Sequence, residues 1–167
     1  DKGRAFEAAL AFFGVADRLA WDRVWLRPVA SFKRSQSFTS EGAAVASWMR
    51  IGELEARKIK TAPYNAAAFR KALRQIRRLT REPDSDEIVR ICADAGVALV
   101  FVREIDKSRI SGATWWSTPT RAVIVLSDRY KRDDFLWFTF FHEAAHVLLH
   151  SKKETFIDDG SEDDDLE

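Results

Sequence analysis

The sequence has little capacity for covalent cross-links and no segment suited to a helical membrane span. Its single cysteine, Cys92, cannot form an internal disulfide, so a fold held together by disulfides is excluded. Cys92 lies between Ile91 and Ala93 at a helical position, which favours a small buried residue over a nucleophile. No run of about 18 or more apolar residues occurs, and the N-terminus lacks a signal-peptide cleavage pattern. We therefore expect a soluble, cytoplasmic protein with no membrane partner.

Although the net charge is only +1, the chain contains two blocks of opposite charge. Residues 50–81 contain ten Lys and Arg but only two acids, whereas residues 158–167 contain seven acids and no base. Such blocks are usually solvated faces or flexible tails. The functional alternative for the basic block is a surface for nucleic acid or an acidic partner. Because its only aromatic residues are Tyr64 and Phe69, direct nucleic-acid binding is the weaker interpretation.

The first half of the chain is predicted to be helical throughout. Apolar residues recur there at helical spacing, and side chains that can cap a helix precede three of the four segments. These caps are Asp17, Ser40 and Asn65, and a polar loop is expected over residues 31–40. The predicted helices cover residues 4–14, 17–25, 40–60 and 65–79.

The second half is predicted to mix helices with strands. Asp84 and Glu87 form a candidate capping box for a short helix that Gly96 ends. Runs of β-branched and apolar residues then indicate strands, and short connections favour antiparallel pairing of the second strand with the third. The predicted elements are helices over 84–95 and 133–150 and strands over 97–102, 113–117, 122–126 and 154–157.

These patterns predict an α+β fold class, with a helical N-terminal half packed on a small, mostly antiparallel sheet. We divide the chain into a helical subdomain, residues 1–81, and an α+β domain, residues 82–167. The predicted helix over 133–150 is apolar around most of its circumference, so we expect it to be buried.

All three histidines of the chain lie on this helix, two of them in the pattern His-Glu-x-x-His. At helical spacing His142 and His146 lie about 40° apart around the axis and about 6 Å apart along it. Two imidazoles so placed can bind one Zn²⁺, and Glu143 beside them can act as a general base. The alternative is a structural role, with the histidines satisfied in the core and Glu143 in an ion pair.

A catalytic zinc ion usually has three protein ligands, so this helix supplies an incomplete set. His150 lies about 12 Å along the axis from His142, too far for one ion to reach both without strain. We therefore expect His150 to support the site rather than bind metal. Since the chain has no other histidine, the third ligand should be a carboxylate, and the acidic block over 158–167 offers several.

The segment from Arg129 to His150 resembles the ImmA/IrrE family of zinc metallopeptidases. A looser similarity, to members whose peptidase domain follows a helix-turn-helix (XRE-like) repressor domain, extends over Phe12–Val15, Trp25, Phe32–Ser35 and Val45–Arg50. The resemblance implies a zincin fold of the gluzincin type for residues 82–167, in which His142 and His146 bind zinc and Glu143 is the general base.

The family's third ligand is a glutamate in a Glu-x-x-Ala-Asn/Asp helix that follows an acidic loop. Glu167 is the matching position, so the resemblance implies that the third ligand is Glu167 or lies beyond the chain end. The chain is expected to be a fragment truncated at its C-terminal end. With two histidines alone, its zinc affinity should be reduced.

The resemblance implies a zinc-dependent, site-specific endopeptidase that acts on a repressor or antitoxin-type transcriptional regulator. Activity is expected of the full-length parent and not necessarily of this fragment. A substrate peptide could add to a strand edge within residues 113–126. DNA would bind only through a helix-turn-helix domain, which this chain lacks.

A second hypothesis is a non-catalytic sensing or dimerisation module of a helix-turn-helix transcriptional regulator. The tryptophans of the helical half, Trp21, Trp25 and Trp48, would then supply a homodimer interface. Zinc content and repressor cleavage by the full-length protein and by its Glu143→Gln variant distinguish the two hypotheses.

Overall fold

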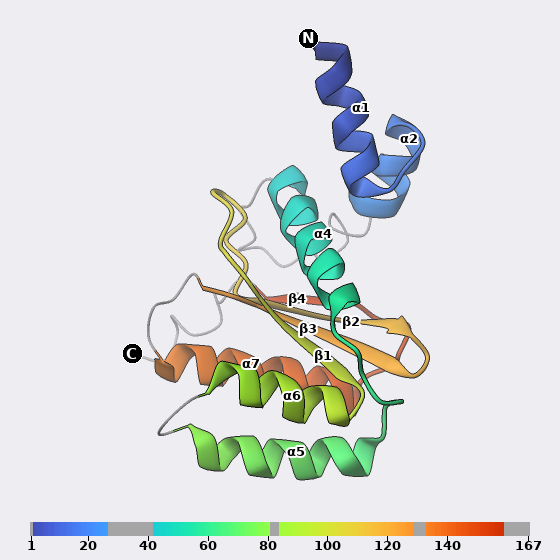
Figure 1. Ribbon diagram of the computed structural model, residues 1–167. Helices are drawn as coiled ribbons and strands as arrows, with labels where there is room; N and C mark the ends of the chain where they lie inside the picture. The colour runs from blue at the N-terminus through green and yellow to red at the C-terminus, as the bar shows by residue number, and fades with distance from the viewer. Residues whose placement is uncertain (1, 27–41, 81–83, 129–132, 159–167) are drawn as a thin grey trace.

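The computed structural model describes residues 2–26, 42–80, 84–128 and 133–158 (Figure 1). Within these ranges the chain is α+β, with six α-helices, one π-helical turn and a four-stranded mixed sheet. The elements are α1 (Lys2–Phe13), α2 (Arg18–Trp21), η1 (Asp22–Leu26), α4 (Gly42–Lys58), α5 (Ala66–Leu79), α6 (Ser85–Asp94), β1 (Val97–Val102), β2 (Gly112–Thr118), β3 (Arg121–Ser127), α7 (Asp133–Leu149) and β4 (Phe156–Asp158). None of the described helices combines the length and apolar content needed to cross a lipid bilayer.

The strands lie in the order β1-β3-β2-β4. β2 and β3 pair antiparallel, as predicted, while β1 pairs parallel with β3. β4 pairs antiparallel with β2 from Gly112 to Thr114. The prediction of a docking edge within residues 113–126 is therefore wrong for β3 and for the start of β2, because these segments pair with a strand on each side.

Helices cover both faces of the sheet, which explains why β1 and β3 are continuous apolar runs. α4 lies on one face, whereas α6 and α7 lie on the other, with α5 packed against α6 (Figure 1). Along β1, Val97 and Leu99 join the core cluster shared with α5, α6 and α7. The alternate residues Ala98 and Val100 join the cluster shared with α4. Helices of the first half thus complete the core around the sheet.

The burial of Trp48 on α4 corrects one expectation. Its side chain is completely buried in the core cluster between α4 and the sheet. Trp48 therefore cannot contribute to a homodimer interface, because α4 uses its apolar stripe within the chain. Trp21 and Trp25 are only partly buried.

Three predicted helix starts are confirmed. Asp17, Asn65 and Asp84 each accept a hydrogen bond from a backbone N–H in the first turn of the helix that follows. The single helix predicted over residues 17–25 is instead split into α2 and the π-helical η1. Ser40 and the loop predicted over residues 31–40 lie outside the described residues.

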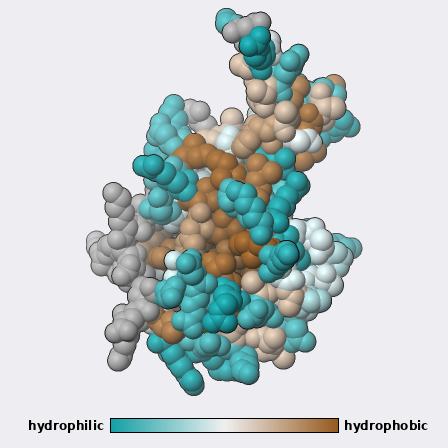
Figure 2. All heavy atoms as spheres, in the orientation of Figure 1, coloured by the Kyte–Doolittle hydropathy of each residue, from teal (hydrophilic) through white to brown (hydrophobic). Residues whose placement is uncertain are grey.

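α1 projects from the rest of the molecule and contains no buried residue (Figure 1). Figure 2 shows hydrophobic surface on this projecting part as well as across the centre of the visible face. Phe6, Leu19 and Val24 are among the large apolar side chains that stay exposed. No residue of these N-terminal helices is fully buried, although Phe13 and Trp25 pack against the core cluster of α4.

Candidate metal centre

α7 brings the imidazoles of His142 and His146 together. Their i, i+4 spacing places the two Nε2 atoms 3.0 Å apart, with the ring planes at 79°. This distance suits a hydrogen bond when one ring carries the Nε2 proton. Two imidazole nitrogens on one tetrahedral zinc ion lie about 3.3 Å apart. The pair is therefore close to the spacing that a shared metal ion requires.

α7 is buried on one face only, which corrects the expectation that the helix is buried around most of its circumference. Phe138 and Leu149 are 53% and 75% exposed. The buried side chains are Thr139, Phe140, Glu143, Ala144 and Val147. The reason is that α7 lies on the outside of the sheet, so only the side facing β2 and β3 is covered. The His142 side chain is 30% exposed, so solvent can reach it.

Glu143 is completely buried between α7 and β2. Its Oε2 atom accepts a 2.5 Å hydrogen bond from Thr114 Oγ1, while its Oε1 atom is buried with no hydrogen-bond partner among the described residues. Burial raises the pKa of this carboxyl to about 8, the Thr114 hydrogen bond lowers it, and the negative charge of Asp158 raises it. A buried acid with an unpaired oxygen is costly in a purely structural role.

A glycine on β2 permits this burial. A Cβ atom at Gly112 would lie 2.6 Å from Glu143 Oε1 and 2.9 Å from Thr139 Cγ2. Any larger residue would push α7 away from the strand. The close approach therefore depends on a residue with no side chain at position 112.

β4 positions His146. The Phe156 ring stacks on the imidazole, with centroids 4.0 Å apart and planes at 11°. Burial lowers the pKa of His146 to about 4, the positive charges of His142 and His150 lower it as well, and Asp158 opposes them. The imidazole is therefore neutral near pH 7, which is the form that binds metal ions.

Asp158, one of the seven acids of the C-terminal block, lies beside the histidines. Its Oδ2 atom is 4.0 Å from His142 Nε2, and its side chain is 19% exposed. Even so, the described part of the chain contains no group of three His, Cys, Asp or Glu side chains that could hold a metal ion. Glu167 lies outside the described residues. His150 is exposed at the end of α7, its ring centroid 5.1 Å from that of His146.

The described residues supply two of the donors that a zinc site requires. Two imidazole nitrogens converge, a neutral His146 is ready to bind, and the unpaired Glu143 Oε1 is buried nearby. His142 and His146 would hold the ion, and a carboxylate would complete the set. Burial raises the pKa of the Cys92 thiol to about 12, so this thiol is neither a ligand nor a nucleophile.

Sequence reasoning singled out His142 and His146, whose imidazoles the structure brings together, and Glu143, which it buries. It missed the residues that contact Glu143 and His146. Thr114 and Phe156 come from β2 and β4, far from α7 in sequence. The only sequence signal for Thr114 is a hydroxyl in an otherwise apolar stretch of a strand. Phe156 carries no signal beyond its place in a predicted strand.

One of three comparisons with known proteins gave a match. Residues 92–167 match a peptidase family model described as the IrrE N-terminal-like domain. The matched region starts near the end of α6 and includes the sheet and α7. Searches of curated proteins and of solved structures each gave no match. The family match indicates a metallopeptidase-like domain and supports the assignment of residues 92–167 to the ImmA/IrrE family.

Proposed function

We propose that the α7 site is the centre of a zinc-dependent endopeptidase that acts on a repressor or antitoxin-type regulator. His142 and His146 are two of the zinc ligands, and Glu167 is the candidate for the third. The observation that carries this proposal is the buried, unpaired Oε1 of Glu143 next to two converging imidazoles. The match to a peptidase family supports it.

Glu143 is the general base in this proposal. When bound, zinc supplies a Lewis acid that polarises the scissile carbonyl and favours ionisation of the attacking water. With its pKa raised to about 8, Glu143 holds its proton at pH 7 in the metal-free protein. With zinc held by His142 and His146, the pKa of Glu143 would fall, and its Oε1 atom could then accept a proton. Thr114 keeps the carboxyl oriented by binding Oε2. Glu143 can then return the proton to the leaving amine.

The test uses the full-length protein and its cognate repressor. Zinc content is measured by mass spectrometry and cleavage by gel, for the wild type, Glu143→Gln and the surface control Glu55→Gln, whose carboxyl is 45% exposed on α4. We expect Glu143→Gln to retain zinc and lose at least about 100-fold in cleavage rate, since general base catalysis contributes that much. Cleavage by Glu143→Gln equal to that by Glu55→Gln would reject Glu143 as the base.

The second candidate is a sensing or dimerisation module of a helix-turn-helix regulator. It is favoured by the exposed apolar side chains of the N-terminal helices, Phe6, Leu19 and Val24. Large exposed patches of this kind often mark interaction sites. Light scattering on the wild type and on Leu19→Ser tests it, because a dimer held by this surface should dissociate in the variant. A regulatory module would also keep its effect on transcription in Glu143→Gln.

A further inference from the structure

A cavity on the α4 side of the sheet is separate from the metal centre. It has a volume of about 400 Å³, and its lining residues come from the N-terminal helices, α4, β2 and the segment before β4. Trp115 and Thr155 line it, whereas their sequence neighbours Thr114 and Phe156 contact Glu143 and His146 on the opposite face. Cavities of this size can hold a small-molecule ligand.

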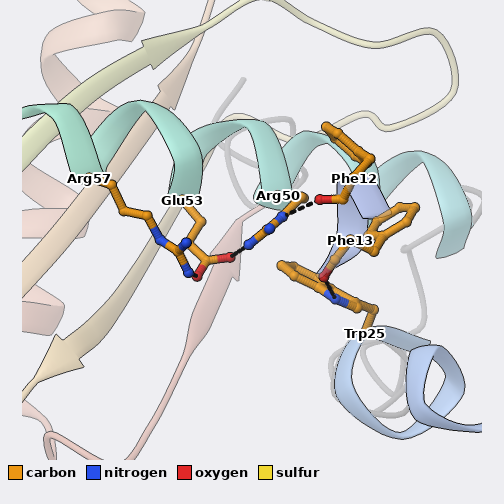
Figure 3. A network of polar contacts seen from close by, with 6 residues as sticks. All are labelled: Phe12, Phe13, Trp25, Arg50, Glu53 and Arg57. Atoms are coloured by element: carbon orange, nitrogen blue, oxygen red, sulfur yellow. Dashed lines mark hydrogen bonds and ion pairs between the residues drawn. The ribbon is translucent and has the colours of Figure 1, made fainter. Parts of the chain in front are cut away.

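Flat aromatic side chains form much of the wall. Phe13, Trp25 and Trp115 line the cavity from three different elements. Trp25 is fixed there, because its indole N–H donates to Phe13 O at 3.1 Å and its ring lies 5.6 Å from the Phe13 ring (Figure 3). With the indole N–H already bonded, the remaining ring surface is apolar. Such walls suit a planar apolar ring.

Charged groups of α4 line another side of the cavity. Figure 3 shows the polar contacts among them. Glu53 lies between two arginines. One of its oxygens is 2.6 Å from Arg50 Nη1, and the other is 2.6 Å from Arg57 Nη2. Both Glu53 oxygens therefore form ion pairs. The two arginines and the one glutamate together have a net charge of +1. The lining favours an anion.

Arg50 offers a hydrogen-bond donor at this wall. Its Nε donates to Phe12 O at 2.6 Å and its Nη1 to Glu53, whereas its Nη2 makes no hydrogen bond within the described ranges. Arg50 is only 8% exposed. A Cβ atom at Gly14, where φ is +67°, would lie 2.9 Å from Nη2, so the glycine leaves room beside this donor. The Arg57 side chain is 60% exposed and can turn towards a ligand.

We propose that this cavity binds a small planar aromatic carboxylate. The ring would lie against Trp25 and Trp115, and the carboxylate would accept hydrogen bonds from Arg50 Nη2 and Arg57. Guanidinium groups bind carboxylates through strong, charge-assisted hydrogen bonds. This site is independent of the peptidase proposal, because it uses none of the residues of the metal centre.

The probe is naphthalene-2-carboxylate, and naphthalene-2-carboxamide is the neutral control of the same shape. Affinities are measured by calorimetry, and the place of binding by the NMR shifts of the Trp25 and Trp115 indole N–H groups. We expect both indole signals to move and the carboxylate to bind about fivefold more tightly than the carboxamide, the factor expected of a partly exposed ion pair. Equal affinities, or no shift of either indole, would overturn the proposal.

Two neighbouring residues of α4 provide matched variants. Arg57→Gln should weaken carboxylate binding about fivefold and leave carboxamide binding unchanged. Lys58→Gln should change neither, because this exposed lysine pairs with Glu55 and does not line the cavity. Both positions are on the surface, so both variants should fold. Equal effects of the two substitutions would show that the arginine at the cavity has no special role and would reject the site.

Discussion

The Phe156 ring lies parallel to the His146 imidazole, with centroids 4.0 Å apart. Phe156 belongs to β4, which pairs with β2 through Thr114, and Thr114 in turn binds Glu143. The Nδ1 atom of His146 is buried without a hydrogen-bond partner in the described structure. Stacking on β4, rather than a hydrogen bond to Nδ1, therefore orients this histidine, and the sheet edge and the candidate metal centre form one unit.

Removing the stacked ring should weaken metal binding. We expect Phe156→Ala to reduce zinc affinity about tenfold, the size of effect seen when groups that orient metal ligands are removed. Competition with a chromophoric chelator measures this in the full-length protein. Phe6→Ala, which truncates a half-exposed ring on α1, is the control and should bind zinc as the wild type does. Unchanged zinc affinity in Phe156→Ala would show that the stacking does not orient His146.

The metal-free protein should lose stability as the pH rises from about 6.5 to about 8. The pKa of Glu143 is raised to about 8 in the folded state, so the folded state keeps a proton that the unfolded state has lost. Stability therefore falls with rising pH, by up to about 2 kcal/mol across this window. Urea unfolding in the presence of a chelator measures the fall, which Glu143→Gln should abolish.

His146 sets the lower limit, about pH 6.5, of the pH range in which stability falls with rising pH. Its pKa is lowered to about 4 in the folded state, from an ordinary value of 6.5. Below pH 6.5 the unfolded state binds the extra proton, so this histidine makes stability fall as the pH falls. The two effects oppose each other between about pH 4.5 and 6.5, and of these two groups only Glu143 affects stability between about pH 6.5 and 8. An equal slope in the wild type and Glu143→Gln above pH 6.5 would contradict the raised pKa.

Gly112→Ala should destabilise the protein by about 1–3 kcal/mol, the usual cost of overpacking a core. Its Cβ atom would collide with Glu143 Oε1 and Thr139 Cγ2. Shortening Glu143 to alanine removes one of these contacts, so Gly112→Ala should cost less in the Glu143→Ala background. A double-mutant cycle from urea unfolding measures this coupling. Strict additivity would mean that position 112 does not constrain Glu143.

Thr114→Val should raise the pKa of Glu143 further. The valine is nearly isosteric but cannot donate the hydrogen bond to Oε2, which favours the ionised carboxylate. Carbon NMR titration of the metal-free protein, with labelled glutamate, measures the shift. Thr139→Val is the control, since Thr139 Oγ1 donates to Phe135 O rather than to Glu143. A larger shift in Thr139→Val than in Thr114→Val would contradict the assignment of this bond.

Local features were predictable because their causes lie within a few residues. Asn65 and Asp84 accept hydrogen bonds from N–H groups at most three residues later, so the sequence pattern alone predicts the starts of α5 and α6. The apolar, β-branched run over residues 97–102 likewise predicts the strand β1. The i, i+4 spacing of His142 and His146 predicts their convergence on one side of a helix.

Local sequence patterns therefore predict most of the helices and strands and place two imidazoles and a carboxyl on one helix. The surroundings of these groups depend on the tertiary structure. The parallel pairing of β1 with β3, the exposure of Phe138 and the contacts of Thr114 and Phe156 join residues far apart in the chain. The physical reason is that helical periodicity and capping act within a few residues, whereas the burial that shifts the pKa values of Glu143 and His146 depends on how strands pack against α7.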